Sequence, residues 1–140
     1  MKNYNIKNQE QAIRHFFEQM DVEMIAAFLE SSKTYQDMEK EKFMSKLEKL
    51  FEKFIESGDT VLISYPGRCN NCYKDKVGYT FVGNHSFNYI SIIVDAENGT
   101  INDMLECSAF INSDENLNLN KKLYIQNSFL ELIQNFKGKI

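Results

Sequence analysis

The fold of this chain is decided by residues 60–111, which read TVLISYPGRCNNCYKDKVGYTFVGNHSFNYISIIVDAENGTINDMLECSAFI. Strong β-formers fill four runs of this stretch, and Pro, Gly and Asn fill the gaps between the runs. The four runs are residues 60–65, 77–82, 87–95 and 100–111. This pattern predicts four consecutive antiparallel strands joined as a meander.

The turn residues also predict how these strands pair. Asn98-Gly99 favours a two-residue type I′ hairpin, because both central positions of that turn need a positive φ. This hairpin places Val94 opposite Asp103, and a turn centred on residues 84–85 places Tyr79 opposite Ile90. One face then collects apolar side chains and becomes the predicted core face, with Asp103 as its charged member. Its apolar members are Val77, Tyr79, Phe81, Ile90, Ile92, Val94, Leu105, Cys107 and Ala109.

The opposite face of the predicted sheet is also too apolar for a bare solvent face. It carries Tyr89, Ile93, Met104 and Phe110 among smaller and polar residues. Aromatic residues and Met are enriched in the cores of protein interfaces. We therefore expect a homodimer through this sheet face.

Helices flank the predicted sheet on both sides. Apolar residues recur at helical spacing over residues 8–20, 22–30, 39–56 and 123–136, and Asp21 can cap the second of these helices. A short extended piece is expected between the second and third helices. The order predicts an α+β fold with N-terminal helices packed on one face of a curved antiparallel sheet, and an extra C-terminal helix. His15 is either a general base or a solvated helix residue.

Composition limits the function further. The 140 residues are 43% hydrophobic and 13% aromatic, enough for the core of one domain without disulfides. A net charge of −4 argues against nucleic-acid binding. The sequence has no apolar run of about 18 residues, and its first eleven residues contain no apolar stretch typical of a signal peptide. We expect a cytoplasmic protein that binds neither nucleic acid nor membrane.

The cysteines offer a possible metal or redox site. Cys69 and Cys72 form a CxxC motif in the first turn, which is half of a zinc site or a redox pair. A zinc ion needs two more ligands, and the predicted meander puts His85 and Cys107 near the opposite end of the sheet. We therefore expect no metal and no cofactor, with Cys69 and Cys72 exposed and Cys107 buried.

A ligand pocket is predicted between the first helix and the sheet. Asp103 is the best acid or base candidate, because a carboxylate on a core face is costly to bury and its pKa rises. Tyr79 shares that face, and Phe16 and Phe17 of the first helix complete the predicted pocket. Two of these residues also have ordinary structural explanations. Tyr79 can be a core residue with its hydroxyl at the rim, and Asp103 can be solvated at the sheet edge.

The element order resembles the NTF2-like (SnoaL-like, cystatin-like fold) superfamily over about residues 8–112. The resemblance rests on that order and on the stretches AIRHFFEQMDVEMIAAFL (12–29) and YISIIVDAENGTINDMLECSAF (89–110). It implies a cone-shaped cavity between a concave sheet and the helices, and commonly a dimer. Family members include isomerases, cyclases, dehydratases and many non-catalytic binding domains. The family's familiar Asp/His and Tyr/Asp catalytic sets have no clear match here, and the CxxC turn and the last helix are additions.

Three function classes remain, because a fold does not decide function. The favoured hypothesis is a non-catalytic protein that binds a small ligand or a partner. The first alternative is a small-molecule enzyme of isomerase, dehydratase or hydrolase type that uses Asp103 and Tyr79. The second alternative is a CxxC turn that holds a metal. We expect one domain over residues 1–140, with its core over about 8–112 and a helical extension over about 117–137.

Overall fold

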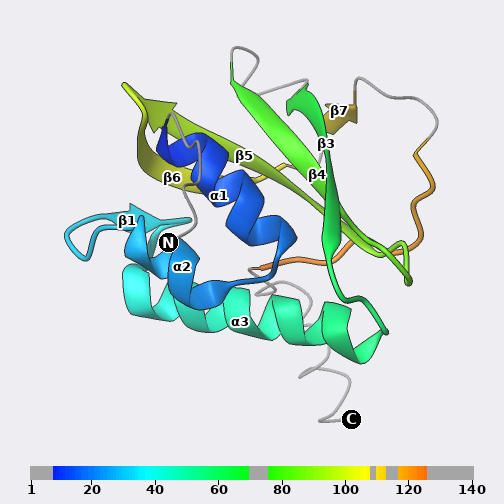
Figure 1. The fold of residues 1–140 in the computed structure, drawn as a ribbon. Coiled ribbons are helices and arrows are strands. Elements are labelled where there is room, and N and C mark those ends of the chain that lie inside the picture. The colour runs from blue at the N-terminus through cyan, green and yellow to red at the C-terminus, as the bar shows by residue number, and fades with distance from the viewer. Residues whose placement is uncertain (1–7, 70–75, 108–109, 113–116, 126–140) are drawn as a thin grey trace, which may run out of the picture.

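A computed structural model gives the structure of the chain and describes residues 8–69, 76–107, 110–112 and 117–125 (Figure 1). This part of the chain is α+β, with helices first and an antiparallel sheet after them, as the sequence predicted. The sheet has five strands where four were predicted, because residues 100–106 and 110–112 belong to two different strands. The elements are α1 (Gln9–Glu18), α2 (Val22–Ala27), β1 (Thr34–Tyr35), β2 (Met38–Glu39), α3 (Lys40–Glu56), β3 (Leu62–Cys69), β4 (Val77–Gly83), β5 (Tyr89–Glu97), β6 (Thr100–Glu106) and β7 (Phe110–Asn112). Within the described ranges, no helix is both long and apolar enough to cross a membrane.

The first two helices begin at side-chain caps. The side chain of Asn8 accepts a hydrogen bond from the backbone N–H of Gln11 at 2.9 Å, and Asp21 accepts one from Met24 at 3.2 Å. Such caps satisfy amide groups that have no partner inside the helix. The prediction that Asp21 caps the second helix is confirmed.

Strands β3 to β6 form the predicted meander. The order across the main sheet is β6-β5-β4-β3-β7, so β6 and β7 lie at opposite edges. The type I′ turn between β5 and β6 is confirmed, because Asn98 and Gly99 have φ values of +53° and +82°. The short extended piece predicted before the third helix is a separate two-stranded hairpin, β1–β2.

The register differs from the prediction at two places. Tyr79 lies opposite Ile92 instead of Ile90, because β4 and β5 are joined by a longer turn than predicted. A shift of two residues keeps every side chain on its predicted face, since side chains alternate with a period of two. The side chains of β4 and β5 therefore stay on their predicted faces despite this error.

A β-bulge changes the faces of β6. Asp103 lies opposite Asp95, not Val94 as predicted, because Asn102 is an extra residue in the ladder. A slip of one residue moves each following side chain to the other face. Met104 is consequently part of the main core and is fully buried.

The main core lies between the helices and one face of the sheet. Phe17 of α1 is at its centre, with ring centroids 4.9 Å from Phe51 of α3 and 4.2 Å from Phe81 of β4. Five residues of the predicted core face belong to this core: Tyr79, Phe81, Ile90, Ile92 and Val94. Val77 does not, since it is 53% exposed at the end of β4 that extends past α1 (Figure 1).

A second apolar cluster lies on the opposite face of the sheet. Cys69, Ile93 and Cys107 are its buried members, and Leu105 and Phe110 pack against them. Leu105 and Cys107 were predicted on the other face, and the bulge in β6 explains this error. Ile93 is fully buried by its own chain, as is Met104 in the main core. Two of the four residues on which the predicted dimer face rests are therefore not available to a partner.

Residues 117–125 are extended, although a helix was predicted from Leu123 onward. Lys122 forms a parallel bridge with Tyr89, and the N–H of Leu123 donates to the Tyr89 carbonyl at 2.6 Å. β6 ends before it reaches this part of β5, so the edge of β5 is open to the segment. Leu123 and Ile125 complete the main core there. The rest of the predicted last helix lies outside the described residues.

Candidate functional site

An open hollow of about 810 Å³, here named the helix hollow, lies between α1, α2 and α3. Its volume is within the range of roughly 300–1,000 Å³ that is typical of small-molecule sites. The lining comes from the end of α1, the turn that follows it, the start of α2 and the middle of α3. The lining residues are His15, Phe16, Gln19, Met20, Asp21, Val22, Glu23 and Glu48.

The sharp end of α1 shapes one wall of the helix hollow. The N–H of Asp21 donates to the Phe16 carbonyl at 2.9 Å, and the N–H of Met20 donates to the Phe17 carbonyl at 3.0 Å. These two bonds form a Schellman motif. Met20 occupies its left-handed position with φ +53°, where glycine is the usual residue. The chain therefore reverses over two residues, and Met20 and Val22 both line the helix hollow.

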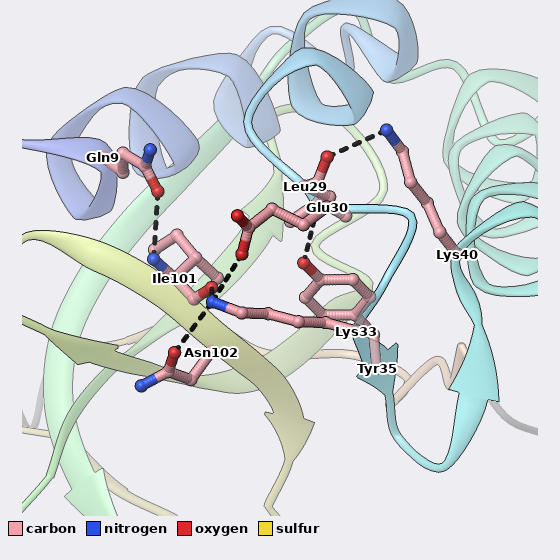
Figure 2. Close-up of polar contacts among 8 residues, drawn as sticks. All are labelled: Gln9, Leu29, Glu30, Lys33, Tyr35, Lys40, Ile101 and Asn102. Carbon is pink, nitrogen blue, oxygen red and sulfur yellow. Dashed lines mark hydrogen bonds and ion pairs between the residues drawn. The ribbon is translucent and has the colours of Figure 1, made fainter.

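Contacts to β6 hold the loop that follows α2 (Figure 2). The ammonium group of Lys33 donates to Asn102 Oδ1 at 3.0 Å and to the Ile101 carbonyl at 3.4 Å. It also pairs with Glu30 at 2.6 Å. Tyr35 Oη accepts a hydrogen bond from the N–H of Glu30 at 2.8 Å. The bulge residue Asn102 thus helps to position α2, which is one wall of the helix hollow.

The lining of the helix hollow combines negatively charged and apolar side chains. Asp21, Glu23 and Glu48 supply three carboxylates. The C-terminal end of α1 adds the partial negative charge of its carbonyl groups. Apolar contact area comes from residues 16, 20 and 22. This arrangement favours a ligand that joins a positive charge to an apolar body.

His15 lines the same hollow, which sequence alone did not predict. It is partly buried, and its ring packs edge-on against Phe16 with a centroid distance of 5.1 Å. An imidazole beside three carboxylates adds a hydrogen-bonding group to the lining.

Tyr79, a predicted pocket residue, packs under α1 instead of lining the helix hollow. The Arg14 guanidinium lies 4.5 Å from its ring centroid, and the Tyr79 hydroxyl donates to Glu10 at 3.4 Å. Burial, followed by the negative charge of Glu10, raises the pKa of Tyr79 above its usual value. The residue is 8% exposed, so it is a core residue with a polar contact at its hydroxyl.

Arg14 and Glu18 cover the edge of β3. Arg14 Nε donates to Ser64 Oγ at 2.7 Å, and a second guanidinium nitrogen donates to the Ser64 carbonyl at 3.5 Å. The N–H of Ser64 donates to the Glu18 carboxylate at 3.3 Å. Pro66, two residues further along the strand, has no N–H to offer. These groups occupy backbone positions that an added strand would need.

Asp103, the predicted acid or base, lies on β6 and holds the β1–β2 hairpin. Its Oδ1 accepts hydrogen bonds from the N–H of Gln36 at 2.9 Å and of Met104 at 2.8 Å. Burial raises the pKa of Asp103, and these two bonds lower it by less. Asp103 therefore contacts the hairpin while Tyr79 contacts α1. The structure does not show these two side chains meeting around one cavity.

The two predicted pocket phenylalanines have different surroundings. Phe16 lines the helix hollow. Phe17 is fully buried and fills the space between α1, α3 and β4, where the predicted pocket would lie. Ligand binding by the four predicted residues stays a prediction. Of these four, Phe16 lines the helix hollow and the other three do not.

The cysteines contradict the predicted geometry. Cys69 is the last residue of β3 and is only 4% exposed, although we expected it in an exposed turn. Cys107 is equally buried and belongs to the same cluster. Cys69 and Cys107 therefore belong to one buried cluster, and the prediction that Cys69 is exposed is wrong. Cys72 lies outside the described residues, and within them no group of three metal-binding side chains is present.

Two signals for the helix hollow were present in the sequence but were not specific. Glu48 belongs to a helix whose charges follow the pattern of an ordinary solvated face. Met20 precedes the cap residue Asp21, at a position where a helix end often has Gly. Only the packing of α1 and α2 against α3 brings these residues together.

Comparison with protein-family models, with curated proteins and with solved structures finds no match for this chain.

Proposed function

We propose that this chain is a non-catalytic binding domain whose helix hollow holds a small organic cation, such as a protonated amine with an apolar body. The lining carries the proposal, because it combines three carboxylates with three apolar side chains in a hollow of ligand size. Each exposed ion pair contributes about 0.2–1 kcal/mol, and burial of one ring contributes a few kcal/mol. A simple amine therefore binds with a Kd on the order of millimolar, once the cost of association is included.

The enzyme alternative has less support. It needs Asp103 and Tyr79 to face one substrate, whereas each makes polar contacts with a different element. The order of helices and sheet is compatible with the NTF2-like resemblance, whose members include both enzymes and binding domains. That likeness adds support by analogy alone.

The proposal is tested with a cationic probe and a neutral probe of similar shape. In a ligand-observed NMR titration, 2-phenylethylammonium binds the wild-type chain, and 3-phenylpropan-1-ol binds less tightly. The double variant Glu23→Gln/Glu48→Gln weakens binding of the ammonium probe by about 2- to 30-fold, since it removes two exposed ion pairs. Added salt weakens this binding in the wild type as well.

The matched control is the double variant Glu41→Gln/Glu56→Gln. Both residues are exposed on α3 and lie outside the lining. The two substitutions remove the same total charge as Glu23→Gln/Glu48→Gln. This control retains most of the wild-type affinity. Equal losses in the two double variants, or equal affinities for the ammonium and the alcohol, contradict the proposal.

A further inference from the structure

A second hollow, of about 420 Å³, lies at the end of the main sheet and shares no lining residue with the helix hollow. We name it the sheet-end hollow. It is lined by Pro66, Gly67, Arg68, Val77, Ile111 and Asn112. In Figure 1 the ends of β3 and β4 beside residues 70–75 extend past α1, and β7 lies along β3.

One row of side chains crosses this hollow on three strands. Arg68 of β3 is directly opposite Val77 of β4 on one side and Ile111 of β7 on the other. Val77 is 53% exposed and Ile111 is 45% exposed. Two branched apolar side chains thus flank one guanidinium in a line across the sheet. Among the described residues that line this hollow, Arg68 alone carries a charge.

The backbone under this row is already rigid. Gly67 and Gly78 are directly paired, and the ring of Phe110 occupies the space that a Cβ would take at each of them. An aromatic ring packed on paired glycines holds β7 against β3 and β4.

The outer edge of β7 is open to a further strand. β7 is the last strand in the sheet order, and no strand in the described ranges pairs with its outer side. The side-chain Oδ1 of Asn112 is buried and has no hydrogen-bond partner among the described residues. A buried acceptor left unpaired is costly, so the described residues leave this end of β7 incompletely hydrogen-bonded. By contrast, α1 covers the neighbouring edge of β3 at Ser64.

We propose that the sheet-end hollow binds an extended peptide segment of another protein. The peptide adds to the outer edge of β7 and has an acidic residue between two apolar residues at alternate positions, so that all three side chains point to the face of Arg68 and Ile111. Its backbone N–H groups pair with the outer edge of β7, its apolar side chains contact Ile111, and its carboxylate pairs with Arg68. The charge of Arg68 selects the acidic partner.

The test uses three fluorescein-labelled peptides and the full chain. The peptides are acetyl-Val-Thr-Asp-Thr-Val-amide, the same sequence with Lys in place of Asp, and the Asp peptide with Pro in place of its second Thr. In fluorescence anisotropy titrations, the Asp peptide binds the wild-type chain most tightly. The Pro peptide binds at least about tenfold more weakly, because Pro has no N–H and breaks the ladder.

Two variants separate the charge from the apolar contact. Arg68→Glu weakens binding of the Asp peptide by about tenfold or more and strengthens binding of the Lys peptide. The reason is that it reverses the one charge among the described lining residues. Ile111→Ser weakens binding of both the Asp peptide and the Lys peptide. The matched controls are Lys49→Glu on α3 and Ile63→Ser on β3, which alter exposed residues outside the lining and leave the binding unchanged.

Several outcomes overturn the proposal. The first is that the Asp peptide does not bind at about 1 mM, a concentration near the Kd of the weakest specific contacts. The second is that the Asp and Pro peptides bind equally well. The third is that Arg68→Glu binds the Asp peptide with unchanged affinity. The Lys peptide provides a check on folding, because a misfolded Arg68→Glu chain would lose both peptides. These outcomes leave the cation site in the helix hollow unaffected, since the two hollows share no residue.

Discussion

Asp103 combines partial burial of its carboxylate with two backbone hydrogen bonds, and its pKa is raised mainly by the burial. A carboxyl group whose pKa is higher in the folded chain holds its proton more tightly there. Its contribution to stability is therefore fully present below the unfolded value of 3.8 and is lost as the pH rises through the folded value. Ionisation of the Asp103 carboxyl group therefore lowers the free energy of unfolding.

Asp103→Asn is expected to show this directly, because Asn keeps an oxygen acceptor for Gln36 and Met104 but does not ionise. As the pH rises from about 3.5 to 7, the free energy of unfolding of the variant increases relative to that of the wild type. Urea unfolding at a series of pH values measures the difference. Glu52→Gln, an exposed change on α3, should show no such trend. A difference that is flat, or that has the opposite slope, contradicts the assigned direction.

Cys69 and Cys107 make a second residue-scale prediction. Each is 4% exposed in the cluster around Ile93, so a thiol reagent reaches them only when the cluster opens. In a Cys72→Ser background, both thiols should react with dithiobis(nitrobenzoate) at least about 100-fold more slowly than in urea-unfolded chain. A native rate near that of the unfolded chain would show that the cluster is open.

At the scale of elements, α1 acts as a cover for a strand edge. Glu18 accepts the N–H of Ser64, and Arg14 contacts the hydroxyl and carbonyl of the same residue. Natural sheets need such covers, since an open edge pairs with edges of other molecules. The stripe at positions 10, 14 and 18 of α1 is explained by this role and by the contact with Tyr79.

Glu18→Ala should therefore have two effects. It leaves the N–H of the buried Ser64 without its acceptor, which costs about 1–3 kcal/mol in the free energy of unfolding. It also uncovers the edge of β3, so self-association should rise with concentration in sedimentation velocity. Glu41→Ala, on the exposed face of α3, is the control for helix and charge effects. A Glu18→Ala chain that is as stable and as monomeric as this control would remove the proposed role of α1.

The sequence predicted the elements better than their registers. Side-chain periodicity located three helices and the meander, and Asn98-Gly99 identified its turn. The bulge at Asn102 was not predicted, because no residue type is obligatory at such a position. That one extra residue exchanged Met104 for Leu105 in the main core and placed Asp103 opposite Asp95 instead of Val94. The helix hollow depends on tertiary packing, so the local signals of its residues were not specific to a site.

At the scale of the whole molecule, the two hollows lie on different parts of the fold and differ in charge. Carboxylates surround the helix hollow, whereas Arg68 provides the charge among the described residues that line the sheet-end hollow. The packed core between them, centred on Phe17, leaves the predicted pocket filled. Binding is therefore expected at the margins of the helix layer and of the sheet, and not between the two layers.

The most direct measurement for the cation site is a protein-observed NMR titration of the ¹⁵N-labelled chain with 2-phenylethylammonium. The account predicts saturable shift changes concentrated at residues 15–23 and at Glu48, with little change at Val77, Asp103 or Ile111. The same shifts should be smaller at equal probe concentration in Glu23→Gln/Glu48→Gln. Shift changes centred on Tyr79 and Asp103, or no saturable change up to about 20 mM probe, well beyond the expected millimolar Kd, would contradict the account.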